Sequence, residues 1–198
     1  MTPNAPVDAE RPNIVRVYDH LLGGSHNFVA DRGAAQEFQA KSPGAARTIR
    51  LNWAFAGRAV RYLARAGIGQ FLAIGPGIPT MGNVHEVARR YAAGARVVCV
   101  DNDEVAVLHH RAILDRNENA VAIQADLRRP TDILSNPQLQ ATLDLSRPAA
   151  VLLVALLHFL PYTANPAVLV AQLPDALAPG SYLVPGQVAA YRGAGCGR

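Results

Sequence analysis

The fold of this chain is decided by the stretch Gln70-Phe71-Leu72-Ala73-Ile74-Gly75-Pro76-Gly77-Ile78-Pro79-Thr80, which continues as Met81-Gly82-Asn83-Val84-His85-Glu86-Val87-Ala88. Its apolar part is short enough for one buried strand, and it ends in a Gly-x-Gly turn that leads into a helix. Because glycine has no Cβ, a ligand can approach the backbone amides of such a turn closely. Asn83 and Glu86 have the spacing of a capping box, so we expect the helix to begin here. Strand, glycine turn and helix in this order are typical of a nucleotide-binding site.

The spacing of the glycines argues against a dinucleotide site. The fingerprint of NAD-binding folds has a third glycine three residues after the second; that position is Thr80 here, and Gly82 is out of register. A lone Gly-x-Gly also occurs in ordinary strand-to-helix turns, so the flanking sequence has to decide between the two interpretations.

A second strand is predicted at residues 96–100, and it is followed by Asp101-Asn102-Asp103. This places a carboxylate at the carboxyl end of the strand, about 20 residues past the glycines, where nucleotide-binding folds hold a ribose diol. We expect Asp103 to cap the following helix, from Glu104 to about Asp115, and Asp101 to accept hydrogen bonds from the diol.

Two further strands end in polar residues. The third, at 120–124, is followed by Asp126-Leu127, and Asp126 is either an acceptor for an adenine amino group or a capping or loop aspartate. The fourth, at 149–156, is apolar throughout, which is typical of a central parallel strand, and His158 follows it. With a fifth strand at 181–184, the pattern predicts an α/β fold with a doubly wound, mainly parallel sheet that binds its ligand at the carboxyl ends of the strands.

The residues before the glycine strand are predicted to form a helical cap over this end of the sheet. Asn13 caps a short helix that ends at Gly23-Gly24, a second helix covers 31–40, and Ser42-Pro43 begins a long third helix. On the third helix, Trp53 lies on the apolar face and is expected in the core rather than against a ligand. The predicted organisation is a disordered leader at 1–11, the cap at 12–66, the ligand-binding core at 67–185 and a disordered tail at 186–198.

Several motifs together resemble an actinobacterial family of S-adenosylmethionine-dependent methyltransferases, formerly a domain of unknown function. The motifs are, in chain order, residues 16–24 with Asn27-Phe28, residues 71–88, residues 100–103, residues 125–128, and residues 146–148 with 151–159. The resemblance implies a Rossmann-like methyltransferase fold and S-adenosyl-L-methionine as the cofactor, but no particular methyl acceptor. It also implies that the sheet lacks its last two strands, and that the first strand has Ala73 where such enzymes usually carry an acidic residue.

The cofactor-binding residues expected from these motifs are Tyr18, Gly24, Asn27, Gly75, Pro76, Gly77, Asp101, Asn102, Asp126, Leu127 and Leu156. Of these, the resemblance alone suggests that Tyr18, Gly24 and Asn27 line a lid over the cofactor. His158 is the candidate base for an acceptor that must lose a proton, because histidine titrates near neutral pH. The alternative is that His158 has only a structural role at the end of the strand, where it forms a hydrogen bond to a neighbouring loop.

Composition limits the partners and the compartment. The net charge is +4, but the arginines are scattered and aromatic residues are few, so nucleic acid is an unlikely partner. The most apolar run, 151–160, is too short to span a membrane, and two cysteines make no disulfide framework, so we expect a cytoplasmic protein. A small-molecule acceptor is favoured, and self-association through the exposed edge of the fifth strand is one option.

Three functions remain open on sequence alone. The first is S-adenosylmethionine-dependent methyl transfer to an unknown acceptor. The second is a domain that binds the cofactor but is catalytically impaired or regulatory, because the sheet ends early. The third, which Thr80 disfavours, is an NAD-dependent oxidoreductase.

Overall fold

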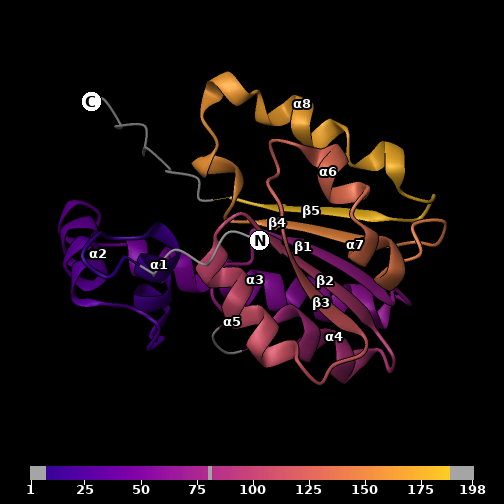
Figure 1. Cartoon of the computed structure of the whole chain (residues 1–198), viewed down its shortest axis with the longest axis horizontal. Coiled ribbons are helices and arrows are strands. Elements are labelled where there is room, and N and C mark those ends of the chain that lie inside the picture. Colours follow the sequence, from indigo (N-terminus) through magenta and orange to yellow (C-terminus); the bar gives the residue numbers. More distant parts are fainter. Residues whose placement is uncertain (1–7, 80–81, 188–198) are drawn as a thin grey trace, which may run out of the picture.

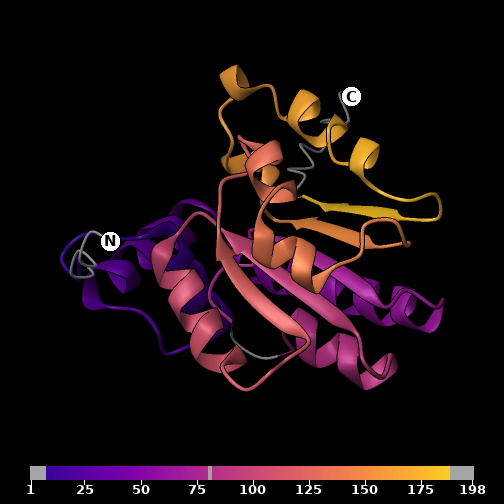
Figure 2. The ribbon, with the colours of Figure 1, turned by 45° about the vertical axis from the view of Figure 1, so that its right-hand side comes forward.

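The structure is a computed structural model of the chain and describes residues 8–79 and 82–187. Five parallel strands form one sheet in the order β3-β2-β1-β4-β5 (Figure 1). The strands are β1 Gln70–Ile74, β2 Arg96–Asp101, β3 Ala120–Gln124, β4 Ala150–Val154 and β5 Tyr182–Gly186. The prediction of an α/β fold with a doubly wound parallel sheet is confirmed, because the chain builds outward from β1 to β3 and then crosses to β4 and β5. Figure 2 shows β5 in yellow at one edge.

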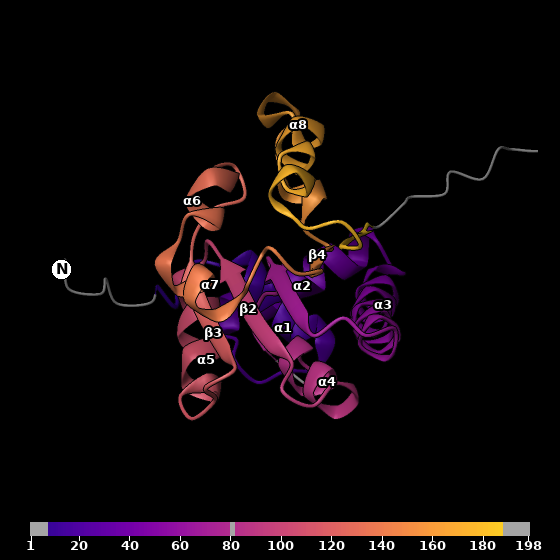
Figure 3. The same ribbon diagram turned by 90° about the vertical axis from the view of Figure 1, so that its right-hand side faces the viewer.

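Helices cover both faces of the sheet, which explains why the strands are apolar on both sides (Figure 3). On one face, α3 Ala45–Arg65, α4 Val84–Tyr91 and α5 Glu104–Leu114 pack on side chains such as Phe71 and Val97. On the other face, α6 Pro130–Leu134, α7 Pro137–Thr142 and the α8 segment Pro166–Ala171 cover side chains such as Leu72 and Val98. The predicted capping box at Asn83 and Glu86 begins α4, as expected.

The N-terminal cap consists of α1 Ile14–Leu22, α2 Val29–Lys41 and the first part of α3. These helices share a separate small apolar cluster that includes Val17, Leu21 and Ile49. In Figure 1, α1 and α2 (indigo) lie beyond one end of the sheet. The cap therefore has its own packing, and α3 joins it to the sheet.

Several boundaries differ from the sequence prediction. The long helix α3 begins at Ala45 with Gly44 as its cap; Ser42 does not cap it, because its carbonyl accepts the Ala45 amide in a preceding turn. Strand β4 ends at Val154, two residues early, because Ala155 has a positive φ of 56°. Short 3-10 segments follow at Leu157–Phe159, Tyr162–Ala164 and Pro174–Ala176.

The last strand is longer than predicted, because Pro185 and Gly186 continue it to position 186 and pair with β4. On this strand, Leu183 and Val184 are half-buried and pack on the two core clusters. The expected tail beyond residue 187, the first seven residues of the leader and Thr80 lie outside the described residues. Among the described helices, none combines the length and apolar character that crossing a bilayer requires.

Candidate active site

A cavity of about 350 Å³ lies between the carboxyl ends of the strands and the N-terminal cap. Its sheet side is built by the loops that follow β1, β2, β3 and β4, and its cap side by α1 and α3. Nine of the expected cofactor-binding residues line it: Tyr18, Gly75, Pro76, Gly77, Asp101, Asn102, Asp126, Leu127 and Leu156. The parallel sheet thus brings together residues from four separate turns at the edge where such folds bind ligands.

The glycine turn needs both of its glycines. Gly75 and Gly77 have φ of 67° and 70°, in the left-handed region that side chains rarely adopt. At Gly75 a Cβ would also lie 2.6 Å from the Leu156 side chain, so β1 and the turn after β4 approach closely there. The turn is therefore shaped by backbone conformation and by contact with a neighbouring loop.

Both sides of Gly77 are held by side chains. Its amide donates to Asp101 Oδ2 at 3.1 Å, and its carbonyl lies 3.0 Å from His110 Nε2. Because a carbonyl only accepts, Nε2 of His110 carries the proton and Nδ1 is unprotonated. Burial lowers the pKa of His110 to about 4, so the ring is neutral near pH 7. These bonds orient the peptide groups that face the cavity.

Asp101 is buried, and each carboxylate oxygen accepts one backbone amide: Oδ2 that of Gly77, and Oδ1 that of Asp103 at 3.0 Å. Burial raises the pKa of Asp101, and the hydrogen bonds from Asp103 and Gly77 partly offset this. Asp103 caps α5, as predicted. Both oxygens of Asp101, the expected acceptor for the diol, thus already accept a backbone amide.

Asp126 is bound to its own loop. Its carboxylate accepts hydrogen bonds from the Arg128 guanidinium, with 2.9 Å from Nε to Oδ2, and from the Arg128 amide. This hydrogen bonding with Arg128 lowers the pKa of Asp126. Both residues line the cavity. The arrangement matches the alternative of a loop aspartate, whose side chain stabilises a turn. Asp126 nevertheless remains in the wall of the cavity.

His158 does not line the cavity. It is exposed, and its Nε2 lies 3.3 Å from the Tyr18 hydroxyl, which belongs to the cap. The Phe159 ring packs edge-on against Tyr18 with centroids 5.5 Å apart, and both of these rings line the cavity. Contacts between α1 and the turn after β4 therefore place Tyr18, rather than His158, next to the cavity.

The cap contributes a mainly apolar wall with Trp53 in it. The expectation that Trp53 lies in the core is wrong, because this half-buried side chain faces the cavity together with Ala56 and Gly57. A helix face that packs on a sheet and one that lines a cavity have the same apolar periodicity, so the sequence could not separate the two.

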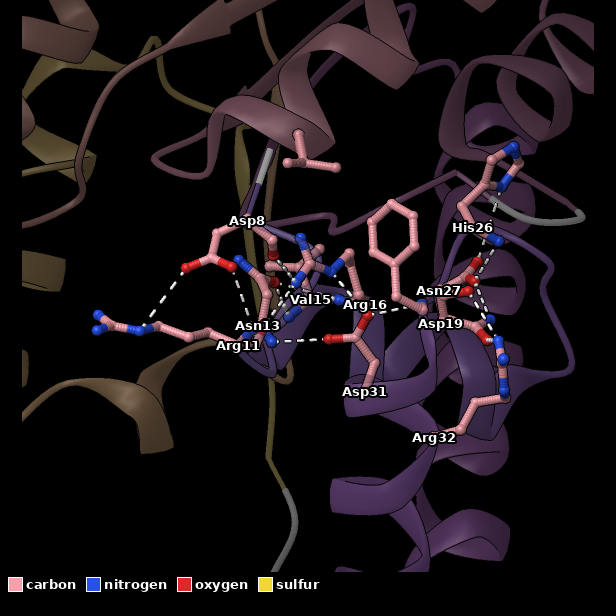
Figure 4. Close-up of polar contacts among 12 residues, drawn as sticks. Asp8, Arg11, Asn13, Val15, Arg16, Asp19, His26, Asn27, Asp31 and Arg32 are labelled. Atoms are coloured by element: carbon pink, nitrogen blue, oxygen red, sulfur yellow. Dashed lines mark hydrogen bonds and ion pairs between the residues drawn. The ribbon is translucent and has the colours of Figure 1, made fainter. Parts of the chain in front are cut away.

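Gly24 and Asn27 do not line the cavity. Asn27 instead holds the Asp19 carboxylate (Figure 4). Asn27 Nδ2 donates to Asp19 Oδ2 at 2.9 Å, and the His26 amide donates to the same oxygen at 2.8 Å. A Cβ on Gly24 would collide with the Asp19 carboxylate. Asp19 itself is buried and lines the cavity.

Sequence reasoning missed Asp19 and His110. The signal for His110 was its spacing on the helix. His110 lies on the same helical face as Asp103 and Ala106, and this face is directed toward the glycine turn. Asp19 follows Tyr18 in the first motif, residues 16–24. The sequence carries no signal for its role, because that role depends on the conformation of the loop that follows α1.

Comparison with known proteins identifies the family of the chain. A family model described as S-adenosyl methyltransferase matches residues 1–192. A crystal structure from Thermobifida fusca, described provisionally as a methyltransferase, has 44% sequence identity and a TM-score of 0.86, over 92% of this chain and 69% of that chain. A DUF574 family protein from Streptomyces avermitilis has 37% identity and a TM-score of 0.86, over 90% of this chain and 69% of that chain. No curated protein matches the sequence. The chain therefore belongs to the S-adenosyl methyltransferase family, whose cofactor is S-adenosylmethionine.

Proposed function

We propose that this protein transfers the methyl group of S-adenosylmethionine to a small molecule, with the nucleoside held at the carboxyl ends of β1, β2 and β3. The observation that carries the proposal is the Gly77 amide bonded to the buried Asp101 carboxylate in the wall of the cavity. In nucleotide-binding folds a strand-end carboxylate accepts the ribose hydroxyls, and a glycine turn lets the ligand approach the backbone closely.

The residues present fit the nucleoside. Each carboxylate oxygen has two lone pairs, so Asp101 can accept hydroxyl groups beyond its two backbone partners. Gly75 and Gly77 leave no Cβ in the path of the ligand. Asn102 and Leu127 come from neighbouring strand ends and are proposed to flank the adenine, with Asp126 as the acceptor for its amino group.

When bound, the cofactor supplies an activated methyl group, so the protein has chiefly to orient the reactants and exclude water. The cap suits the second task because its wall is mainly apolar, with Ile49, Trp53 and Val60 facing the cavity. Because α1 and α3 cover the cavity on the side opposite the strand ends, we propose a small acceptor.

His158 remains the proposed base for an acceptor that must lose a proton. Its Nε2 is 3.3 Å from the hydroxyl of Tyr18, and Tyr18 is in the wall, so the proton would reach His158 through this hydroxyl. The exposure of His158 outside the wall favours a second candidate, a domain that binds the cofactor without turnover.

The test is isothermal titration calorimetry with S-adenosylhomocysteine and, separately, with NAD. We expect binding of S-adenosylhomocysteine alone; binding of NAD alone would overturn the proposal. Incubation with methyl-tritiated cofactor and a bacterial extract, divided by ultrafiltration, then tests turnover. Label in the small-molecule fraction supports the acceptor class, label in macromolecules contradicts it, and an absence of transfer supports the non-catalytic candidate.

A further inference from the structure

The cap side of the cavity contains polar atoms that lack partners. Among the described residues, Asp19 Oδ1 and Asn52 Nδ2 are buried and have no hydrogen-bond partner, and both residues line the cavity. An unpaired buried donor or acceptor is costly, so such atoms point to a missing partner. One of them is an anionic acceptor on α1, and the other is a donor on α3.

Asp19 differs from the other carboxylates of the wall. Within the described part of the chain, the acidic residues that line the cavity are Asp19, Asp101 and Asp126. Both oxygens of Asp101 accept backbone amides, and both oxygens of Asp126 accept from Arg128. At Asp19, Oδ2 has two donors, whereas the nearest imidazole nitrogen, Nδ1 of His26, is 4.0 Å from Oδ1, too far for a hydrogen bond.

Asp19 and Asn52 lie on the cap side of the cavity, and one part of the cofactor has no partner assigned so far. Asp101 lies at the strand end that suits the ribose, and the sheet offers no carboxylate at the end of β1, where the buried residue is Ala73. The rest of the cofactor is an amino acid, with an ammonium group that needs an acceptor and a carboxylate that needs a donor.

We propose that Asp19 binds the ammonium group, and Asn52 the carboxylate, of the cofactor's amino-acid end. This inference rests on the proposed function and adds that the cap, rather than the first strand, binds that end of the ligand. Asn27 and the His26 amide hold Asp19 in place, and Gly24 gives its carboxylate room. The cap thereby closes over the cavity by contacting the ligand itself.

The test compares ligands that differ only at this end, by calorimetry on the full chain. S-adenosylhomocysteine has the complete amino acid, its decarboxylated analogue retains the amine, and 5′-methylthioadenosine lacks both groups. We expect Asp19→Asn to weaken S-adenosylhomocysteine roughly tenfold or more and to leave 5′-methylthioadenosine unchanged. We expect Asn52→Ala to weaken S-adenosylhomocysteine, but not the decarboxylated analogue.

Asp126→Asn is the matched control, a wall carboxylate assigned to the nucleoside, and it should change the affinities of S-adenosylhomocysteine and 5′-methylthioadenosine by the same factor. If Asp19→Asn changes the affinities of these two ligands by the same factor, or changes neither affinity, the proposed role of Asp19 is wrong. If that variant fails to fold, the wild-type protein supplies the test: equal affinities for S-adenosylhomocysteine and 5′-methylthioadenosine would overturn this inference and leave the proposed function standing. Wild-type protein that binds neither ligand overturns the proposed function, and the inference with it.

Discussion

Asp101 has to serve two purposes, since its carboxylate accepts the amides of Gly77 and Asp103 and is also the proposed ribose ligand. Asp101→Ala should weaken binding of S-adenosylhomocysteine by about 1.5–3 kcal/mol, the range for hydrogen bonds to a charged group. It should also lower the unfolding free energy, because the two amides lose their acceptor. Calorimetry and urea unfolding measure the two effects, and unchanged affinity would remove Asp101 from the site.

His110 predicts a pH dependence of stability. Burial lowers its pKa from 6.5 to about 4, so on acidification the unfolded chain takes up a proton before the folded chain does. The stability that the neutral ring contributes is complete above pH 6.5 and is lost as pH falls toward 4. From pH 7 to pH 5 this loss is about 2 kcal/mol.

Urea unfolding of wild-type protein and His110→Gln at pH 7 and pH 5 isolates this contribution. The variant should lose less stability than the wild type over this interval, since its side chain does not titrate. Parallel losses in both proteins would show that His110 is not protonated differently in the two states.

The N-cap residue of helix α1, Asn13, also anchors the helix to the core. Asn13 Oδ1 accepts the Val15 and Arg16 amides, which caps the helix, and Asn13 Nδ2 donates to Asp103 Oδ2 at 2.5 Å. One side chain thus joins the cap to the turn that carries Asp101. Asn13→Ala should reduce the unfolding free energy by about 1–2 kcal/mol and should also weaken S-adenosylhomocysteine.

Asn136→Ala is the matched control for that variant. Asn136 caps α7 in the same way, by accepting the amides of Gln138 and Leu139, but α7 does not line the cavity, whereas α1 does. Its loss should cost similar stability in thermal or urea unfolding and leave ligand affinity unchanged. Equal effects of the two variants on affinity would mean that Asn13 acts through stability alone.

At the scale of the whole molecule, we propose self-association through the edge of β5 that faces away from β4, the free edge, which no other strand in the described part of the chain covers. The Tyr182 amide donates to Ala149 in the direction of β4. Because N–H groups of alternate residues point to the same side of a strand, the nitrogen of Pro185 faces the free edge, where proline has no hydrogen to donate. Pro185 therefore limits the addition of another strand.

Pro185→Val should increase self-association through this edge, and Tyr182→Lys, at a position 44% exposed on the same strand, should reduce it. Size-exclusion chromatography with light scattering over a range of concentrations measures both. If neither variant changes the molar mass of the protein, the edge of β5 is not an interface.

Local sequence was sufficient for most of the fold. Five short apolar segments separated by helical patterns predicted the parallel sheet, and the caps at Asn13, Asn83 and Asp103 are present as expected. Strand periodicity, glycine turns and caps involve residues a few positions apart, so their signals can be read directly from the chain. The boundaries of β4 and β5 were less accurate, because the conformation of Ala155 and the pairing of Gly186 depend on neighbouring strands.

Local patterns in the chain were enough to predict the type of fold, the glycine turn and the strand-end carboxylates, whereas long-range packing sets which of these groups are available to a ligand. Only the packed molecule brings Asn13 to Asp103, 90 positions away, and His110 to Gly77. It also places Trp53 in the cavity wall and leaves Asp19 Oδ1 unpaired. The physical reason is that burial and hydrogen-bond partners are set by elements distant in the chain, whereas periodicity reports only on near neighbours.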